Sequence, residues 1–328
     1  VYLRLVQYTL LLLAVPAFVR RWKEARFILL TVSLLCVIGA LAAPLQEVTG
    51  SLPWNDPDWA LQHGRAGFAR YQSLFGDPNI GGMIGGIMPL LLFALNTPSR
   101  QSRARRVLIE VAIWSVSALL VAYSLSLTGI LLFACSTVIR LSVGRKNLVS
   151  VLRVGIVMIL VVIILPADVT DRVTGTVERF LQPTRANAYY PSGSHLESDI
   201  LWRLFEYLDL NDTVVKILFG STYDVVTPAS YINPSAILAH NGYKEMYLAG
   251  GLVGLGFFLA LLLFTAWKAL RLIKGSRQLP AALRGTSLSA AWIYLLLLGI
   301  MFGFPIYHYN GIGLMFWCAA GLIHVLHN

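Results

Sequence analysis

Nine long apolar runs constrain this chain more than any other feature of its sequence. A helix needs about 20 mainly apolar residues, rising about 1.5 Å each, to cross the hydrocarbon of a bilayer. The runs lie at residues 2–19, 27–46, 79–97, 107–124, 126–142, 152–167, 245–267, 286–304 and 311–326. We therefore expect an all-α, polytopic integral membrane protein with about nine transmembrane helices.

The composition agrees with a membrane protein and excludes several other classes. Of the 328 residues, 57% are hydrophobic and 13% are charged, and the mean hydropathy is +0.68. Soluble domains carry about 25% charged residues. A disordered chain, a collagen-like fibre and a small disulfide scaffold are excluded. Cys36, Cys135 and Cys318 lie inside apolar runs as small hydrophobic residues, so we expect neither a disulfide framework nor a metal site.

The basic residues predict which loops face the cytoplasm. Lysine and arginine are retained in short cytoplasmic loops. Alternate loops hold 17 of the 26 basic residues and a single acid, in groups at residues 20–26, 100–106, 140–153 and 268–284. This distribution explains the net charge of +10 by topology, and we expect no nucleic-acid partner. The C-terminus is then cytoplasmic.

The same pattern divides the chain into three regions. Residues 1–167 hold six expected helices and the outer loop 47–78, residues 168–244 form a large outer loop, and residues 245–328 hold three further helices. The loop 168–244 is far longer than a connection requires, so we look for function in the outer loops. The chain begins in an apolar run without an initiator methionine, so we expect further helices upstream.

The first candidate site is the segment from Arg65 to Asn79. Turn-forming residues precede an apolar helix here, and Asn79 or Asp77 is placed to cap its N-terminus. The free N–H groups and positive dipole end of a helix start, together with Arg70, suit an anion such as a diphosphate. The alternative is an ordinary capped helix entry with an interfacial arginine whose head group reaches water.

The second candidate site is the segment that begins with His240 and Asn241 and continues through Tyr243. A neutral imidazole at the outer membrane surface can accept a proton from a sugar hydroxyl as a general base. The alternative is an interfacial or helix-capping histidine. The glycines that follow, at residues 250–256, fit close helix packing better than phosphate binding.

The third candidate site is Arg203 in the large outer loop. Apolar residues surround it in the pattern of an amphipathic helix on the membrane surface. Arg203 is a candidate to clamp a phosphate, and Arg172 and Arg179 are candidates for lipid phosphate contacts. Ion pairs with neighbouring acids and solvated charge are the alternatives.

The order of these segments resembles the O-antigen ligase and O-antigen polymerase superfamily of bacterial membrane glycosyltransferases. Three signatures carry the resemblance: Arg70 followed by Phe75, Pro78 and Asn79; Trp202–Arg203 some seventeen residues before Phe219–Gly220; and His240–Asn241 before Gly250, Gly251 and Gly254. One departure concerns the turn at 124–129. Many relatives carry a Ser–Arg pair there, whereas this chain has Ser124, Ser126, Thr128 and Gly129 but no arginine.

The resemblance implies a metal-independent, inverting transfer of a glycan from undecaprenyl diphosphate to a sugar hydroxyl, without a cofactor. The reaction would take place at the periplasmic face of the inner membrane. The acceptor would be lipid A core in a ligase, or another lipid-linked glycan in a polymerase, where a chain-length regulator is a candidate partner. Arg70 and Arg203 would hold the diphosphate, and His240 would activate the acceptor. Arg65, Asn241 and Tyr243 would complete the substrate site.

The family usually has about a dozen helices, with its large loop before the last three, so the first three would be the ones upstream of this chain. Two other functional classes compete with the transferase. A transporter or flippase would place ionisable residues near the middle of the bilayer, where this sequence has almost none. A non-catalytic assembly subunit is the remaining alternative.

Overall fold

The structure is a computed structural model, and it describes residues 2–49, 74, 78–95, 103–124, 126–143, 214–220, 242–301 and 311–327. These residues form helices without a β-strand among them. Five helical segments are long and apolar enough to cross a membrane: Trp22–Ala42, Pro78–Leu95, Ala104–Ser124, Gly250–Gln278 and Leu283–Ile300. Thr128–Val143 and Ile312–His327 are shorter apolar helices.

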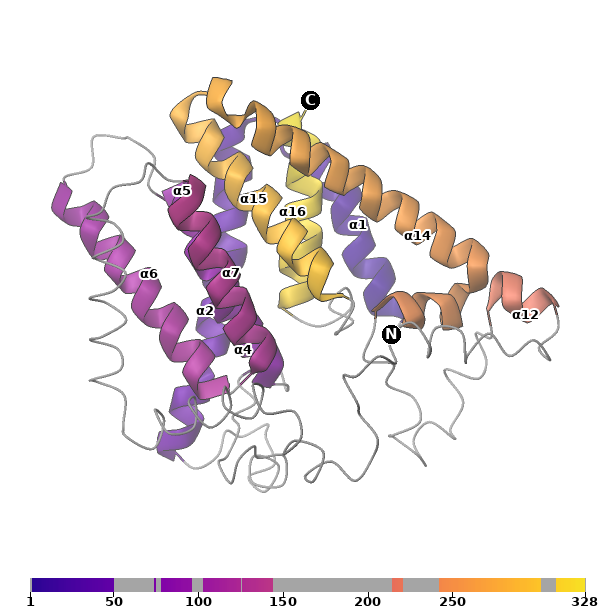
Figure 1. The fold of residues 1–328 in the computed structure, drawn as a ribbon, viewed down its shortest axis with the longest axis horizontal. Helices are drawn as coiled ribbons and strands as arrows, with labels where there is room; N and C mark the ends of the chain where they lie inside the picture. Colours follow the sequence, from indigo (N-terminus) through magenta and orange to yellow (C-terminus); the bar gives the residue numbers. More distant parts are fainter. Residues whose placement is uncertain are drawn as a thin grey trace.

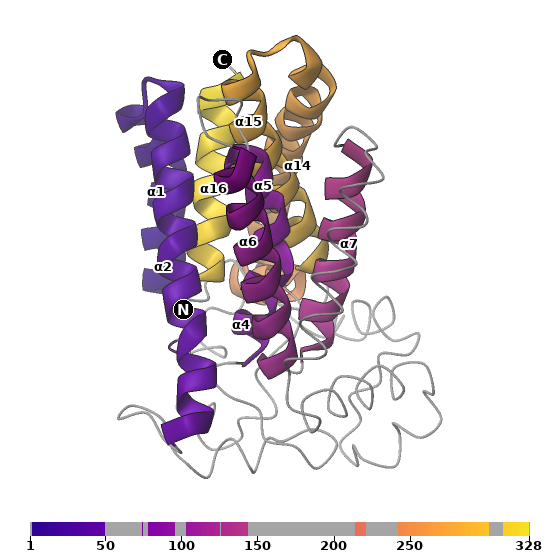
Figure 2. The ribbon, with the colours of Figure 1, turned by 90° about the vertical axis from the view of Figure 1, so that its left-hand side faces the viewer.

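The helices form one bundle (Figures 1 and 2). In chain order the elements are α1 (Tyr2–Phe18), α2 (Trp22–Thr49), α4 (Pro78–Ile87), the 3₁₀ helix η2 (Met88–Leu91), α5 (Leu92–Leu95), α6 (Arg103–Ser124), α7 (Leu127–Val143), α12 (Val214–Phe219), α14 (Gly242–Gly275), the 3₁₀ helix η4 (Ser276–Gln278), α15 (Ala281–Ile300) and α16 (Ile312–His327). Eight of the expected apolar segments coincide with these helices. The segment 152–167 lies outside the described residues, so the number of crossings stays a prediction.

The outer surface of the bundle is apolar, as a bilayer requires. Large hydrophobic side chains on α1, α2 and α14 are exposed, including Phe18, Phe27, Phe257 and Leu263, each at least 64% exposed. A soluble domain of this size rarely exposes a contiguous apolar surface of this kind. This exterior and the five long apolar helices define a multi-pass membrane protein.

The turn between α6 and α7 shows why two helices form from one long apolar stretch. Ser126 caps α7, because its Oγ accepts a hydrogen bond from the Gly129 N–H at 3.2 Å. The Ser126 N–H in turn donates to Ser124 Oγ at 3.2 Å. These bonds end one helix at Ser124 and begin the next at Leu127, which confirms the prediction of two helices here.

The segment α4–η2–α5 is the centre of one half of the bundle, and 83% of its candidate span is buried. A helix that is apolar on all sides must be enclosed by other helices. Three glycines let α6 and α7 approach it closely. A Cβ on Gly82 would lie 2.6 Å from Ser126 Cβ, one on Gly85 would lie 2.8 Å from Leu120 Cβ, and one on Gly86 would lie 2.6 Å from Leu132 Cβ. Small residues at such spacing are typical of packed membrane helices.

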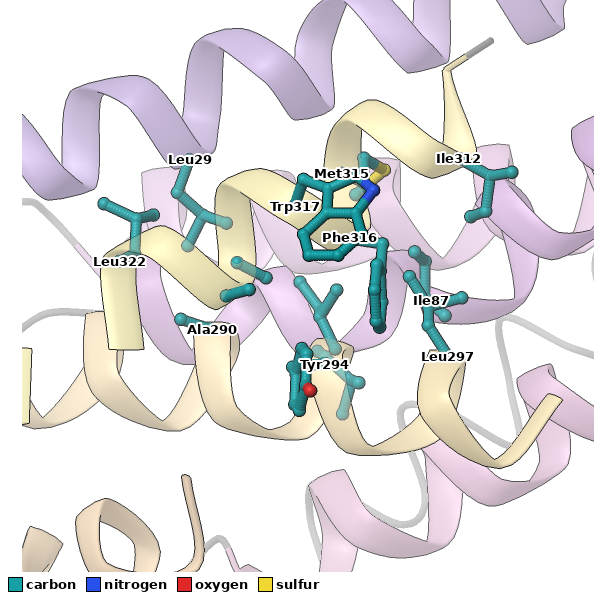
Figure 3. Close-up of a cluster of buried hydrophobic side chains, with 14 of the residues drawn as sticks. Leu29, Ile87, Ala290, Tyr294, Leu297, Ile312, Met315, Phe316, Trp317 and Leu322 are labelled. Carbon is teal, nitrogen blue, oxygen red and sulfur yellow. The ribbon is translucent and has the colours of Figure 1, made fainter. Parts of the chain in front are cut away.

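The second half of the core joins α15 and α16 to α2 and α4 (Figure 3). The Tyr294 ring stacks on Phe316, with centroids 4.9 Å apart, and the Tyr294 hydroxyl donates to the Leu262 carbonyl of α14 at 2.9 Å. Ser289 of α15 makes two hydrogen bonds to the backbone of the neighbouring segment, one to η2 and one to α5. Its hydroxyl donates to the Leu90 carbonyl at 2.8 Å and accepts from the Ala94 N–H at 3.1 Å. Neutral hydrogen bonds to the backbone therefore tie α15 to two neighbours.

Contacts between the helices fix their relative directions. Antiparallel pairs are joined by Gly82 with Ser124 (α4 and α6), Ala94 with Ser289 (α5 and α15) and Tyr243 with Leu298 (α14 and α15). Parallel pairs are joined by Gly82 with Gly129 (α4 and α7) and Thr265 with His324 (α14 and α16). The end of α5, the α14–α15 turn and the end of α16 therefore share one end of the bundle. The α1–α2 turn lies there too, because Val15 of α1 lies against Gly321 near the end of α16, while Cys36 further along α2 reaches the Gly311 carbonyl before the start of α16 (Figures 1 and 2).

Basic residues gather at this shared end, which we call the basic end. Thirteen of the 16 lysines and arginines in the described ranges belong to it, at residues 20–26, 103–106, 140 and 268–284. At the α1–α2 turn, Glu24 Oε2 accepts from the N–H groups of Arg20 and Arg21 at 2.8 and 3.0 Å, and so caps α2. The structure thus brings together the loops that the charge pattern predicts for one membrane face; which compartment they face stays a prediction.

One ion pair lies between α6 and α7 near the basic end. Arg140 Nη2 is 4.0 Å from Glu110 Oε1, and both side chains are less than 20% exposed. The Arg140 guanidinium also lies 4.9 Å from the centroid of the Phe93 ring. This ion pair therefore joins α6 to α7.

The contact between Gly82 and Gly129 makes a testable prediction. A Cβ on Gly129 would lie 2.7 Å from the Gly82 carbonyl, where backbone rather than a flexible side chain must move. We expect Gly129→Ala to destabilise the protein by about 1–3 kcal/mol, the usual cost of overpacking. Thermal unfolding of the detergent-purified protein measures this change.

Gly256→Ala is the matched control, because a Cβ at this position on α14 would have no atom within 4 Å. It should leave the unfolding temperature unchanged or raise it slightly, since alanine favours helices over glycine. Equal unfolding temperatures for the two variants would contradict the close contact.

Candidate functional site

The end of the bundle opposite the basic end holds the starts of α4, α7, α14 and α16. We call it the helix-start end. The starts of α4 and α7 touch there, because a Cβ on Gly129 would lie 2.7–2.8 Å from backbone atoms of Gly82. Each helix start carries a positive partial charge from its dipole, and parallel neighbours add these charges. The C-terminal end of α6 at Ser124 lies beside these two starts with the opposite partial charge, so the three helix ends together leave about half a positive charge, which favours an anion at this end.

The start of α4 is shaped by Pro78 and Asn79. Pro78 is the first residue of the helix, where its missing N–H costs nothing because that group has no helical partner. Pro78 is buried, and Asn79 is partly exposed beside it. Asn79 is the second residue of α4, so it does not occupy the N-cap position that the sequence offered it, and the other candidate, Asp77, lies outside the described residues.

The α6–α7 turn next to α4 is held by serine hydroxyl groups. Ser124 and Ser126 are buried, and both cap the turn as described above. Ser124 Oγ also donates to the Val121 carbonyl at 2.9 Å. The turn therefore contributes structure and the dipole of α7, and its described residues contribute no side-chain charge.

The start of α14 is bent by Gly251. This residue has φ 62° and ψ −161°, which breaks the helix between residues 242–250 and the long segment that follows (Figure 1). Such dihedral angles are essentially restricted to glycine. A Cβ at Gly251 would also collide with the backbone of Leu218 and Phe219 in α12. The bend lets α12 pack against α14.

Tyr243 lies on the short first segment of α14. Its hydroxyl donates to the Leu298 carbonyl of α15 at 3.0 Å, and its ring packs against the core. Burial raises the pKa of Tyr243 to about 12, so the hydroxyl stays protonated and keeps donating at neutral pH. Tyr243 therefore anchors the segment that directly follows His240 and Asn241 in the chain.

Of the predicted site residues, the structure describes Asn79 and Tyr243 and places both at the helix-start end. The other predicted site residues lie outside the described residues: Arg65, Arg70, Arg172, Arg179, Arg203, His240 and Asn241. Their roles stay predictions. Within the described ranges, no group of three or more His, Cys, Asp or Glu side chains is placed to hold a metal ion.

Sequence reasoning missed Gly82 and Gly129, the two residues that join the starts of α4 and α7. Their signal was present in the sequence, because Gly82 and Gly86 are four residues apart on one helix face. Small residues at this spacing favour close helix contact in membranes. The spacing of the glycines in α4 does not predict that α7 is the helix that packs against them.

Comparison of the chain with protein-family models, with curated proteins and with solved structures gives no match. The class that the described residues define is a multi-pass membrane protein whose described elements are all helices.

Adjacent glycines in α14 test the bend. Gly251→Ala should lower the unfolding free energy by about 1–3 kcal/mol from backbone strain alone, with a further loss from the clash with α12. Gly250→Ala is the control, because nothing lies within 4 Å of its Cβ position. Thermal unfolding of both variants measures the difference. If Gly250→Ala were the more damaging variant, the bend at Gly251 would be wrong.

Proposed function

We propose that the chain is a membrane glycosyltransferase of the O-antigen ligase or polymerase type, which transfers a glycan from undecaprenyl diphosphate to a sugar hydroxyl. The proposal rests on the three sequence signatures. It is supported by the paired starts of α4 and α7, because the first signature ends at Asn79 on that helix start. Phosphate groups, such as those of a lipid diphosphate, are among the anions that helix starts bind.

In this reaction the protein's main contributions are to position the donor and acceptor and to stabilise the developing charge. A lipid diphosphate is a good leaving group, so cations near the developing phosphate charge and a base at the acceptor hydroxyl lower the barrier. In the proposal, Arg70 and Arg203 hold the diphosphate beside the start of α4. His240 takes the proton from the acceptor hydroxyl as its oxygen attacks the anomeric carbon, and the carbon–phosphate oxygen bond breaks.

Two features of the described helices favour a transferase over a transporter. The ion pair Glu110–Arg140 lies seven and three residues from the ends of its helices, which is within about 10 Å of the basic end at 1.5 Å per residue. Transporter sites lie near the bilayer midplane instead. The bend at Gly251 also lies at the helix-start end of α14 and not at its middle.

Glycan transfer in proteoliposomes tests the proposal directly. The complete protein is supplied with undecaprenyl diphosphate-linked repeat units, with and without lipid A core, and products are resolved by gel and mass spectrometry. Longer lipid-linked chains without core identify a polymerase, and product on core alone identifies a ligase. Absence of transfer under both conditions, with native glycolipids also inert, would contradict the proposal.

Replacement of the proposed base should abolish most of the activity. A general base contributes about 10²–10⁴-fold, so we expect His240→Ala to slow transfer by a factor in this range while the protein still folds. His195→Ala is the control, because this histidine lies in the same outer loop outside the three signatures, and it should retain activity. A folded His240→Ala protein with full activity would show that the base is another group.

A further inference from the structure

A cluster of cations and aromatic rings lies between α14 and α16 at the basic end. Lys268 Nζ is 3.2 Å from His324 Nδ1, and His324 Nε2 is 3.1 Å from Thr265 Oγ1. The Thr265 hydroxyl donates to the Leu261 carbonyl at 3.0 Å, so it accepts from His324 Nε2–H. His324 Nδ1 is then the acceptor for Lys268, and the ring is neutral. This chain of bonds holds the ammonium group in one place.

A second cation is held by an aromatic ring one turn further along α14. The Arg271 guanidinium lies 3.9 Å from the centroid of the Trp267 ring. The Trp267 ring also contacts His327, with centroids 5.8 Å apart, and stacks against Phe264 at the same distance. The arginine is therefore positioned by a cation–π contact, while its N–H groups stay accessible on an exposed side chain.

Neither cation has its charge neutralised by a neighbour in the described ranges. The ion pair described above, Glu110–Arg140, lies on other helices, and the partners of Lys268 and Arg271 are imidazole and aromatic rings. Two fixed cations without a carboxylate form a site for an anion with several oxygen atoms, such as a phosphate.

An apolar strip leads away from these cations along α14. Phe257, Phe264 and Trp267 share one helix face with Arg271, and the three rings are 75%, 50% and 42% exposed. The strip from Arg271 to Phe257 covers 14 residues, or about 21 Å at 1.5 Å per residue, which is comparable to one leaflet of hydrocarbon, about 15 Å. Cations at the top of an apolar strip match a phospholipid and not a soluble anion.

We propose that Lys268 and Arg271 bind the phosphate group of an anionic phospholipid, whose acyl chains lie against Trp267, Phe264 and Phe257. Basic sites between transmembrane helices commonly hold such head groups. The site lies at the opposite end of the bundle from the proposed transferase site and does not depend on that function. It would fix one lipid at the seam between α14 and α16.

Lipid binding to the purified full chain tests this site. Native mass spectrometry measures the affinity for tetraoleoyl cardiolipin, dioleoyl phosphatidylglycerol and dioleoyl phosphatidylcholine, with inorganic phosphate as a soluble competitor. Lys268→Gln/Arg271→Gln should weaken binding of the anionic lipids about 30-fold, since each cation near a membrane surface contributes about fivefold. Phosphatidylcholine should bind weakly to both proteins, and inorganic phosphate should not displace the anionic lipids.

Lys274→Gln/Arg277→Gln is the matched control. It removes two exposed cations from the same end of the bundle, beyond the proposed site in the chain, and should change the affinity little. If the first pair does not fold, Arg271→Gln alone tests the site, because Arg271 is exposed and its loss leaves Lys268 in place.

Three results would overturn the proposal. The first is an equal loss in both double variants, which would mean that general charge and no site attracts the lipid. The second is equal binding of anionic lipids and phosphatidylcholine, or displacement by inorganic phosphate. The third is loss of a dimer in the Lys268/Arg271 variant with unchanged lipid affinity, which would assign the surface to a second copy of the chain.

Discussion

The packing of α4, α6 and α7 depends on the backbone contact between Gly82 and Gly129. In a membrane, helices gain little from burying apolar surface against each other, because lipid tails are equally apolar. Close approach is then the main source of attraction, and it requires residues without side chains at the contact. Gly82, Gly85 and Gly86 let α6 and α7 enclose α4 on two sides. The same contact sets the starts of α4 and α7 side by side and so creates the polarity of the helix-start end.

Charge divides the bundle into two ends with different chemistry. The basic end carries most of the described lysines and arginines, and carboxylates partner few of them. The helix-start end has few charged side chains in the described ranges, and the starts of α4 and α7 contribute positive partial charge there that the C-terminal end of α6 partly offsets. One end therefore suits the head groups of an anionic leaflet, and the other suits an anionic substrate whose charge must be released after reaction.

Hydropathy predicted the helices well because the bilayer requires about 20 apolar residues in a row, a signal that each segment carries by itself. The division between α6 and α7 was also readable, because the apolar stretch 107–142 is too long for a single crossing. The partner of Glu110, the bend at Gly251 and the contact of Gly82 with Gly129 were not readable. Each depends on which faces of distant segments meet, and Arg140 lies 30 residues from Glu110 in the chain. The sequence proposed Asn79 and Tyr243 as site residues, which stays a prediction, and it gave no sign of the hydrogen bond that anchors Tyr243 to α15.

The described residues at the helix-start end supply less positive charge than a diphosphate substrate requires. Each helix start is equivalent to about half a positive charge, so α4 and α7 together supply about one, and the adjacent C-terminal end of α6 offsets about half of it. A diphosphate ester carries about two negative charges, and more charge develops on it as the glycan leaves. The turn at Ser124 to Gly129 has no arginine to supply the difference. In the proposed function, catalysis therefore depends on Arg70 and Arg203: the dipoles of α4 and α7 select an anion, and the arginines stabilise it as the bond breaks.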